Sequence, residues 1–426
     1  MAEAVETTES RPARARRSFA RRPSSRLFLL LGPAFVAAIA YVDPGNVAAN
    51  LTAGAQYGYL LVWVLVAANV IAVFVQYQSA KLGIVTGRSL PELLGSRLGT
   101  GGRRAFWVQA ELVAAATDLA EVIGGAIALN LLFGLPLPLG GLVVGVVAIG
   151  ILAVQSRRGQ RPFEAVILGL LGVISVGFLA GLFVSPVDWG AAAGGLVPRF
   201  DGAPTVLLAA SMLGATVMPH AIYLHSALAR DRHGHASTPD ARRTLLRATR
   251  VDVVAALVLA GAVNIAMLLL AAASLGGADG TDTIEGAHAA ITAALGPVVG
   301  IAFAVGLLAS GLASTSVGSY AGATIMAGLL TVRIPLLTRR IVTLIPAIVI
   351  LALGVEPTWA LVISQVFLSL GIPFAMIPLL RLTASKDVMG DRADSVWMRV
   401  AGIGIAALVV VLNVALVVLT VAQWVG

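Results

Sequence analysis

The sequence contains no cysteine and few charged residues. Asp, Glu, Lys and Arg make up only 12% of its 426 residues, whereas about 25% is usual in a soluble domain. Without cysteine the chain has neither disulfides nor thiolate ligands. With 58% hydrophobic residues and a mean hydropathy of +0.93, the chain lacks the polar surface of a soluble protein, and disordered, collagen-like and disulfide-rich classes are excluded as well. The composition therefore predicts an all-α integral membrane protein.

Apolar stretches long enough to cross a bilayer recur along the whole chain. A helical span needs about 20 mostly apolar residues, and the sequence predicts eleven transmembrane helices. They cover 27–53, 58–80, 105–132, 137–155, 163–184, 205–228, 252–275, 288–330, 341–355, 358–380 and 397–425. Within 288–330, the longest of these stretches, we expect a break rich in Gly, Ser and Thr.

The basic residues predict the orientation of these spans. If the N-terminus is cytoplasmic, 28 of the 29 Lys and Arg residues fall in cytoplasmic segments, and Arg199 is the exception. By the positive-inside rule we expect a multi-pass protein of the plasma membrane, with the C-terminus outside the cytoplasm. The same rule accounts for the net charge of +8 without a nucleic-acid partner. Residues 1–26 form a basic arm that we expect to be disordered and cytoplasmic, and the scarcity of lysine indicates a bacterial source.

The first span carries an acidic residue next to a helix breaker, in the run Tyr41-Val42-Asp43-Pro44-Gly45-Asn46. Proline removes a backbone donor, so the helix is predicted to unwind at 43–46. Freed carbonyls at membrane depth persist only where they line a cavity or bind something. An acid, an amide and free carbonyls together predict a cation site of oxygen ligands. The alternative is a simple proline kink in which Asp43 pairs with a basic residue.

The sixth span contains a second break, in residues 214–220, where Pro219 frees a carbonyl near Ala215. Met218 places a thioether beside it. This soft ligand suits Mn²⁺ and Fe²⁺ better than Ca²⁺ or Mg²⁺, although methionine in an apolar helix is more often a core residue. Breaks in spans one and six predict two inverted five-helix repeats, 27–184 and 205–380, followed by an eleventh helix at 397–425. Such an arrangement is typical of secondary transporters with a central site.

The third span carries three carboxylates, Glu111, Asp118 and Glu121, whose spacing places them on one helical face. Ionisable residues within spans are typical of proton relays. Arg339 and Arg340 are the candidate partners, and a purely structural stripe of ion pairs is the alternative.

Three further polar residues lie within the predicted spans. His220 follows Met218 by two residues and could titrate near physiological pH. His225 is on another face of the helix, and we expect it to be structural. Gln365 in the tenth span either faces the central cavity or bonds a neighbouring helix.

Together these motifs resemble the Nramp family of proton-coupled manganese and iron transporters, from residue 25 to the C-terminus. Asp-Pro-Gly-Asn at 43–46 and Met-Pro-His at 218–220 are similar to its two defining motifs. Residues 117–124 resemble its third-helix motif, 314–328 its transport signature, and 364–375 its tenth helix.

The resemblance implies a LeuT-like inverted repeat that works by alternating access. It also implies metal ligands, which would be Asp43, Asn46, Met218 and the carbonyl of Ala215, joined in some states by the carbonyl of Ala40 and by Gln365. The implied proton route involves Asp43, Glu111, Asp118, Glu121, His220, Arg339 and Arg340.

Three positions depart from the family pattern. Leu312 and Ala323 stand where glutamine is usual, and Gly371 precedes Pro373 in a region that commonly carries a polar residue. These positions lie in or near helices eight to ten, so rates or ion coupling could differ from those of relatives. Magnesium-handling relatives lack the binding-site methionine, so Met218 argues against that substrate.

The sequence thus predicts a symporter that imports Mn²⁺ or Fe²⁺ with protons into the cytoplasm, and leaves the choice of metal open. We expect no enzymatic activity, no resident cofactor and no obligate protein partner. The alternatives are a sodium-coupled amino-acid transporter of the same fold and a magnesium-type metal carrier. The first would have a glycine-rich unwound segment without the pair of Asp43 and Met218, and the second would transport Mg²⁺ in competition with manganese.

Overall fold

The computed structural model describes residues 32–234, 238–276, 280–281, 283–330 and 335–425. Within these ranges every regular element is helical, as predicted. The basic arm predicted at 1–26 lies outside the described residues. In chain order the elements are α2 (Pro33–Ala38), η1 (Ile39–Val42), α3 (Pro44–Tyr57), α4 (Val62–Thr86), α5 (Leu90–Arg97), α6 (Thr100–Phe133), α7 (Leu137–Arg158), α8 (Gln160–Leu182), α9 (Trp189–Gly194), α10 (Gly202–Thr216), α11 (Pro219–His233), α12 (Pro239–Ser274), α13 (Ile284–Leu295), α14 (Pro297–Leu330), α15 (Leu336–Ala352), α16 (Pro357–Ala384), α17 (Lys386–Met389), η2 (Gly390–Arg392) and α18 (Val396–Val425).

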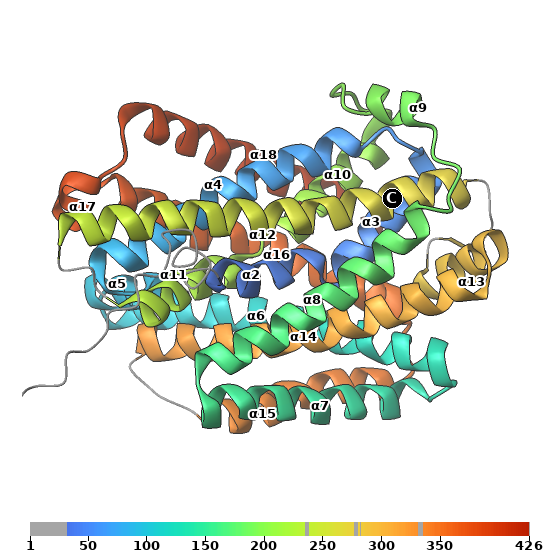
Figure 1. Cartoon of the computed structure of the whole chain (residues 1–426), viewed down its shortest axis with the longest axis horizontal. Helices are drawn as coiled ribbons and strands as arrows, with labels where there is room; N and C mark the ends of the chain where they lie inside the picture. The colour runs from blue at the N-terminus through green and yellow to red at the C-terminus, as the bar shows by residue number, and fades with distance from the viewer. Residues whose placement is uncertain (1–31, 235–237, 277–279, 282, 331–334, 426) are drawn as a thin grey trace, which may run out of the picture.

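The long helices run side by side along the longest axis of the molecule, with α5 and α17 at one end and α9 and α13 at the other (Figure 1). In the described part of the chain, nine helices are long and apolar enough to cross a membrane. The first predicted span is divided among α2, η1 and α3, and the ninth corresponds to the 17-residue α15. Length and composition therefore confirm a multi-pass helical bundle but not the predicted number of eleven spans.

Both predicted helix breaks are present, and each is followed by a proline. Asp43 has an extended backbone (φ −71°, ψ 167°) between η1 and α3, and Pro44 is the first residue of α3. Met218 is likewise extended (φ −70°, ψ 118°) between α10 and α11, and Pro219 begins α11. Proline suits the first helical position because its missing N–H would have no partner there. The same residue prevents the preceding helix from continuing.

The break expected within 288–330 is in a different place from the one predicted. The Gly/Ser/Thr-rich stretch is helical, and α14 is continuous over Pro297–Leu330. The chain breaks instead at Gly296, which has φ 92° and separates α13 from α14. The hydroxyl groups do not interrupt α14 because they bond within it: Ser314 and Ser316 each donate to the carbonyl four residues earlier, at 2.8 Å.

Helix α6 packs closely against both α14 and the break in the first span. A Cβ atom on Gly311 of α14 would lie 2.9 Å from the Cα of Gly125 on α6, so the two backbones touch. A Cβ atom on Gly124 would overlap the side chain of Pro44. Small residues allow this close approach between membrane helices. The carboxylates of α6 are therefore held next to the break that contains Asp43.

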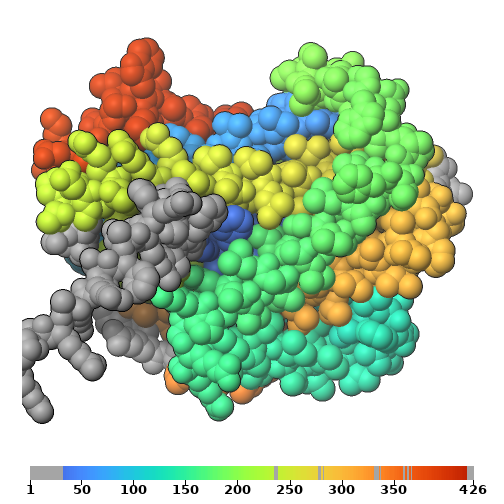
Figure 2. Space-filling model, viewed as in Figure 1, coloured from blue at the N-terminus to red at the C-terminus, as the bar shows by residue number. Residues whose placement is uncertain are grey.

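Helix α2 is enclosed by its neighbours. Pro33, Ala34, Val36, Ala37 and Ala38 are all buried, and only a small patch of α2 is visible between α12 and α8 in the space-filling view (Figure 2). The first half of the first span, α2, thus lies within the bundle, and α3 continues from it toward the end that carries α9 and α13 (Figure 1).

Candidate functional site

The two helix breaks meet at the side chain of Asn46. Its Nδ2 donates to Asp43 Oδ1 at 2.6 Å and to the carbonyl oxygen of Ala215 at 3.0 Å. Its Oδ1 accepts a hydrogen bond from Thr216 Oγ1 at 3.3 Å. All four residues are buried. One amide therefore connects the acid of the first break with the free carbonyl of the second, as expected for a site shared by both.

Asp43 is a buried carboxylate with only one of its oxygens satisfied. Oδ1 accepts from the backbone N–H of Asn46 at 2.9 Å and so caps α3, whereas Oδ2 has no hydrogen-bond partner among the described residues. No Lys or Arg of that part of the chain forms an ion pair with it. The proline kink with a basic partner is thus not supported. A buried anionic oxygen without a partner is costly, and a bound cation would offset this cost.

Met218 and Gln365 belong to the same region. Met218 is fully buried and precedes α11, three residues after Ala215. The amide of Gln365 on α16 lies so close to Gly45 that a Cβ atom there would overlap it and would be 3.2 Å from Asp43 Oδ2. Neither polar atom of the Gln365 side chain has a hydrogen-bond partner within the described residues. Gln365 therefore faces the break instead of bonding a neighbouring helix.

Two carbonyls freed by the first break are already bonded. The carbonyl of Tyr41 accepts from Asn264 Nδ2 at 2.7 Å, and that of Val42 accepts from Ser310 Oγ at 2.5 Å. Asn264 and Ser310 were missed by the sequence analysis, although an asparagine inside the apolar stretch 252–275 could have drawn attention. Ala40 is buried in η1, and its role as a ligand stays a prediction.

Two of the three carboxylates of α6 are paired with α15, as anticipated for Arg339 and Arg340. Arg339 contacts both oxygens of Glu111, at 2.7 and 3.0 Å. Arg340, which is fully buried, binds Asp118, and its Nη1 lies 2.5 Å from Oδ2. Thr315 of α14 donates to the same carboxylate at 2.5 Å. Two of the three predicted relay carboxylates therefore lie in buried or half-buried ion pairs between α6 and α15.

Glu121 and His220 differ from these pairs because neither belongs to an ion pair in the described structure. Both oxygens of Glu121 and both ring nitrogens of His220 are buried without a hydrogen bond. His225, by contrast, bonds Gln76 Oε1 through Nδ1 at 2.8 Å, and Gln76 donates to the hydroxyl of Tyr41 at 2.7 Å. These two hydrogen bonds agree with the structural role predicted for His225.

A conventional metal centre is absent from the part of the chain that the structure describes. No group of three or more His, Cys, Asp or Glu side chains there could hold a metal ion. A cation in this region would therefore bind through mixed ligands: one carboxylate, amides, a backbone carbonyl and a thioether. Such a set is weaker than a structural metal site, which suits an ion that must leave again.

One departure from the family pattern has a packing explanation. A Cβ atom on Gly371 of α16 would lie 2.7 Å from Val113 and 3.0 Å from Pro219. Glycine therefore allows α16 to approach both α6 and the start of α11. Nothing in the structure explains Leu312 or Ala323.

Two broken helices that meet at a buried polar cluster are typical of one class of protein, the multi-pass membrane transporters. The chain matches the Nramp family, described as natural resistance-associated macrophage protein-like, over residues 34–419. It belongs to this family.

Similar proteins agree with this assignment. The chain is 60% identical over 392 residues to the "Divalent metal cation transporter MntH" of Mycobacterium tuberculosis, with 92% of each chain covered. It is 46% identical over 395 residues to the protein of that name from Bacillus subtilis, again with 92% of each chain covered. A crystal structure of the Eremococcus coleocola manganese transporter superimposes with a TM-score of 0.85 at 32% identity, covering 97% of this chain and 89% of the other.

More distant structures share the fold alone. Mhp1, a nucleobase-cation-symport-1 family transporter, superimposes with a TM-score of 0.57 at 18% identity, covering 93% of this chain and 92% of the other. This likeness supports the predicted LeuT-like arrangement with its interrupted first and sixth helices. The boundaries of the two repeats, 27–184 and 205–380, remain a prediction.

Proposed function

We propose that the protein carries divalent transition-metal ions, Mn²⁺ or Fe²⁺, across the plasma membrane into the cytoplasm together with protons. The observation that carries this proposal is the buried, unpartnered Oδ2 of Asp43 beside Asn46 and the carbonyl of Ala215. Met218 adds a thioether from the second break. The names of the similar proteins, divalent metal cation transporters and a manganese transporter, support the same substrate class.

Metal binding requires a rearrangement of Asn46. Its Nδ2 now lies between Asp43 Oδ1 and the Ala215 carbonyl, both of which would be metal ligands. An N–H group cannot coordinate a cation, so the amide must rotate to present Oδ1 instead. This rotation breaks the direct bond between the two helix breaks and replaces it with bonds through the metal. Loading of the site is thereby linked to the relative position of α3 and α10, as alternating access requires.

The ligand chemistry favours transition metals over the abundant hard cations. Ca²⁺ and Mg²⁺ prefer oxygen ligands in numbers that a single carboxylate and a few neutral oxygens do not supply. A thioether adds nothing for them but contributes to the binding of Mn²⁺ and Fe²⁺. Met218 is thus the residue that favours binding of Mn²⁺ and Fe²⁺ over binding of Ca²⁺ and Mg²⁺.

The proposed proton route leads from the site to the carboxylates of α6. Gly124 of α6 packs against Pro44, next to Asp43, and Glu121 and Asp118 follow on the same helix. Thr315 and Arg340 hold the Asp118 carboxylate in place, and Arg339 holds Glu111 further along. His220, two residues after Met218, is a further candidate for the route. With the basic end of the bundle in the cytoplasm, an inside-negative potential would favour entry by about 2.3 kcal/mol per charge per 100 mV.

Competition between metals tests the substrate assignment. Purified protein in vesicles should take up Mn²⁺ in the presence of excess Ca²⁺ or Mg²⁺, and Met218→Ala should become sensitive to both. Met267→Ala is the matched control, because Met267 is equally buried on α12 but is not part of either break. If both variants retain the resistance of the wild type, Met218 is a packing residue and the selectivity argument is wrong. If folded wild-type protein takes up no Mn²⁺, the metal-transport proposal itself fails.

A further inference from the structure

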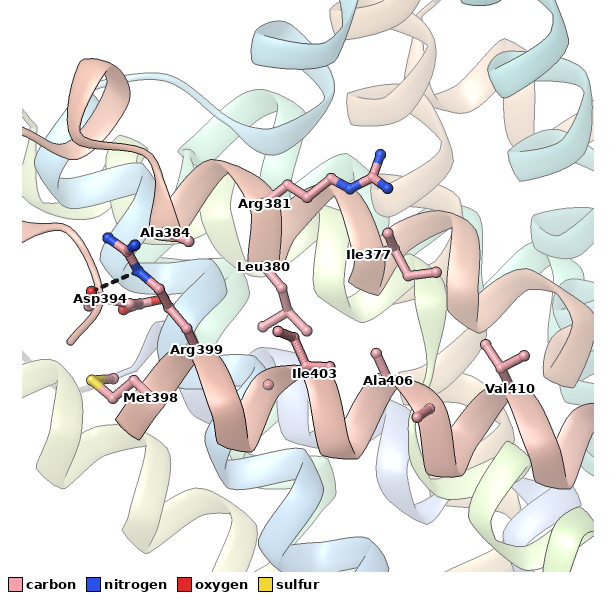
Figure 3. Close-up of a pocket in the computed structure, with 12 residues that line it drawn as sticks. Ile377, Leu380, Arg381, Ala384, Asp394, Met398, Arg399, Ile403, Ala406 and Val410 are labelled. Carbon is pink, nitrogen blue, oxygen red and sulfur yellow. Dashed lines mark hydrogen bonds between the residues drawn. The ribbon is translucent and has the colours of Figure 1, made fainter. Parts of the chain in front are cut away.

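An apolar groove lies between α16 and α18, near the end of the bundle where α17 and η2 connect these helices. Its volume is about 480 Å³. Ile377 and Leu380 of α16 face Ile403, Ala406 and Val410 of α18 across it (Figure 3). Close approach of the helices limits the groove at Gly402, where a Cβ atom would lie 3.2 Å from the side chain of Leu380. The groove does not involve the residues of the candidate metal site.

Beyond its charged lining residues Arg381, Asp394 and Arg399, the groove opens on an apolar surface. Helix α18 exposes large hydrophobic side chains on the outside of the bundle, among them Val400, Ile403, Leu408 and Val411. Because such a surface faces hydrocarbon in a membrane protein, the groove is open to lipid and not to water. Its occupant must therefore offer a flexible hydrocarbon chain.

One end of the groove carries a positive charge. Arg399 is exposed, and its Nε donates to the backbone carbonyl of Asp394 at 3.0 Å, as Figure 3 shows. The carboxylate of Asp394 does not neutralise it, because this carboxylate is bound by Lys81 Nζ and Gln78 Nε2, both at 2.6 Å. Within the described residues Arg399 forms no ion pair. An apolar groove thus ends at a fixed guanidinium group near the membrane surface.

We propose that this groove binds an anionic phospholipid of the surrounding bilayer, with an acyl chain between α16 and α18 and the phosphate at Arg399. The arrangement supplies both parts of such a ligand: hydrocarbon contact along the helices and a bidentate donor for a phosphate. A neutral phospholipid has a phosphate too, but its cationic head group would be repelled by the same arginine. Arg381 of α16, which also lines the groove, and Lys386 of α17 add to the preference for negative charge.

The bound lipid would stabilise the contact of α16 with the neighbouring helices of the bundle. Asp394 fixes the start of α18 to α4 through Lys81, with both side chains buried. Arg399 holds the backbone of Asp394. A phosphate on Arg399 therefore stabilises the junction of α4, α16 and α18, independently of what the central site transports.

Lipid retention by the purified chain tests the proposal. Protein loaded with equal amounts of phosphatidylglycerol and phosphatidylcholine of identical chains is passed into detergent, and bound lipid is counted by native mass spectrometry. We expect selective retention of phosphatidylglycerol, reduced about fivefold in Arg399→Gln, the factor expected for one basic residue at a membrane surface. Arg399→Lys should retain the preference, and Ala406→Phe, which fills the groove, should lose the lipid altogether.

Arg392→Gln is the matched control, because Arg392 lies in η2, shortly before α18, but does not line the groove. Size-exclusion profiles and unfolding temperatures establish that each variant is folded. Equal retention of both lipids, or equal losses in Arg392→Gln and Arg399→Gln, would show unspecific attraction and overturn the proposal. Detection of a second copy of the chain in place of lipid, abolished by Ala406→Phe, would also overturn it and assign the groove to an interface between copies.

Discussion

Asn46 Nδ2 lies 3.0 Å from the carbonyl oxygen of Ala215, so a single side chain connects the two helix breaks of this protein. The same nitrogen is 2.6 Å from Asp43 Oδ1. The two oxygen atoms that would bind a cation are thus connected by an amide N–H group. Binding and the relative placement of the two breaks cannot change independently, which gives a physical basis for coupling metal loading to conformation.

Substitution of Asn46 should strongly reduce metal transport. Asn46→Ala removes an oxygen ligand and the link to Ala215, and we expect Mn²⁺ uptake to fall at least about tenfold, as for the loss of about 1.4 kcal/mol of binding. Asn50→Ala is the control for the loss of a buried amide on the same helix, because Asn50 lies one turn further along α3 and bonds Asn264 instead of Asp43 or Ala215. Uptake and unfolding temperature are measured for both. Similar uptake by Asn46→Ala and wild type would remove Asn46 from the site.

A buried asparagine on α18 replaces a hydrogen bond that α16 cannot make. Pro373 has no N–H, so the carbonyl of Ser369, four residues earlier, lacks its helical partner. Asn413 Nδ2 donates to this carbonyl at 2.6 Å, and the Ser369 hydroxyl donates to Asn413 Oδ1. Asn413→Leu should therefore reduce the free energy of unfolding by roughly 1–3 kcal/mol, the cost of an unsatisfied buried group.

Thermal unfolding in detergent measures the contribution of Asn413. Val414→Leu, at the neighbouring lipid-facing position, should leave the unfolding temperature unchanged. If Asn413→Leu is as stable as this control, the hydrogen bond to Ser369 is not a significant support of α16.

Asp252 of α12 holds the start of the first span. Its two carboxylate oxygens accept from the backbone N–H groups of Gly32 and Ala34, each at 3.0 Å. Asp252→Asn replaces one acceptor with a donor, so one of these N–H groups loses its partner. We expect α2 to leave its buried position more often, by about tenfold if the lost bond contributes about 1.4 kcal/mol.

The absence of cysteine from the chain makes this opening easy to measure. A single Ala38→Cys substitution places a thiol at a buried position of α2, and its rate of maleimide labelling reports the opening. Asp252→Asn should increase this rate, whereas Asp240→Asn, at an exposed position on the same helix, should not. If Ala38→Cys is labelled at the same rate alone, with Asp252→Asn and with Asp240→Asn, Asp252 does not restrain α2.

The contact between α5 and α11 should depend on pH. Glu92 Oε2 lies 2.5 Å from Arg230 Nη1 and 2.8 Å from the N–H of Ser89. Partial burial acts to raise the pKa of Glu92, but the bonds to Ser89 and Arg230 outweigh it and hold the pKa below its ordinary value of 4.5. A lowered pKa means that the charged form stabilises the folded state, fully above the ordinary pKa and progressively less as the pH falls through the lowered value.

Glu92→Gln removes this contribution, so the variant should unfold at a lower temperature than wild type at neutral pH. The difference should disappear at a pH well below 4.5, where the wild-type carboxylate is protonated as well. Asp387→Asn, an exposed acid of α17, serves as the control. A difference that does not change with pH would indicate that Glu92 acts through packing and not through its charge.

Local signals in the sequence predicted the features that local chemistry determines. Pro44 and Pro219 end the preceding helices wherever the rest of the chain lies, so both breaks could be located. The ion pairs of α6 could be anticipated because buried carboxylates need basic partners and few were available. Asn264, Ser310 and Asp252 were missed, because each completes a hydrogen bond to a backbone group more than 200 residues away. The break in the eighth span was misplaced because hydroxyl-rich sequence can remain helical when its hydroxyls bond the preceding turn.

Simultaneous recording of Mn²⁺ uptake and lumenal pH in vesicles tests the central claim most directly. Wild-type protein should accumulate Mn²⁺ and acidify the lumen, and Asp43→Asn, which keeps the shape but removes the charge from the site, should do neither. Manganese entry without proton movement would contradict the coupling. Transport by Asp43→Asn at the wild-type rate, or no uptake by folded wild-type protein, would contradict the proposal that the two helix breaks form a metal site.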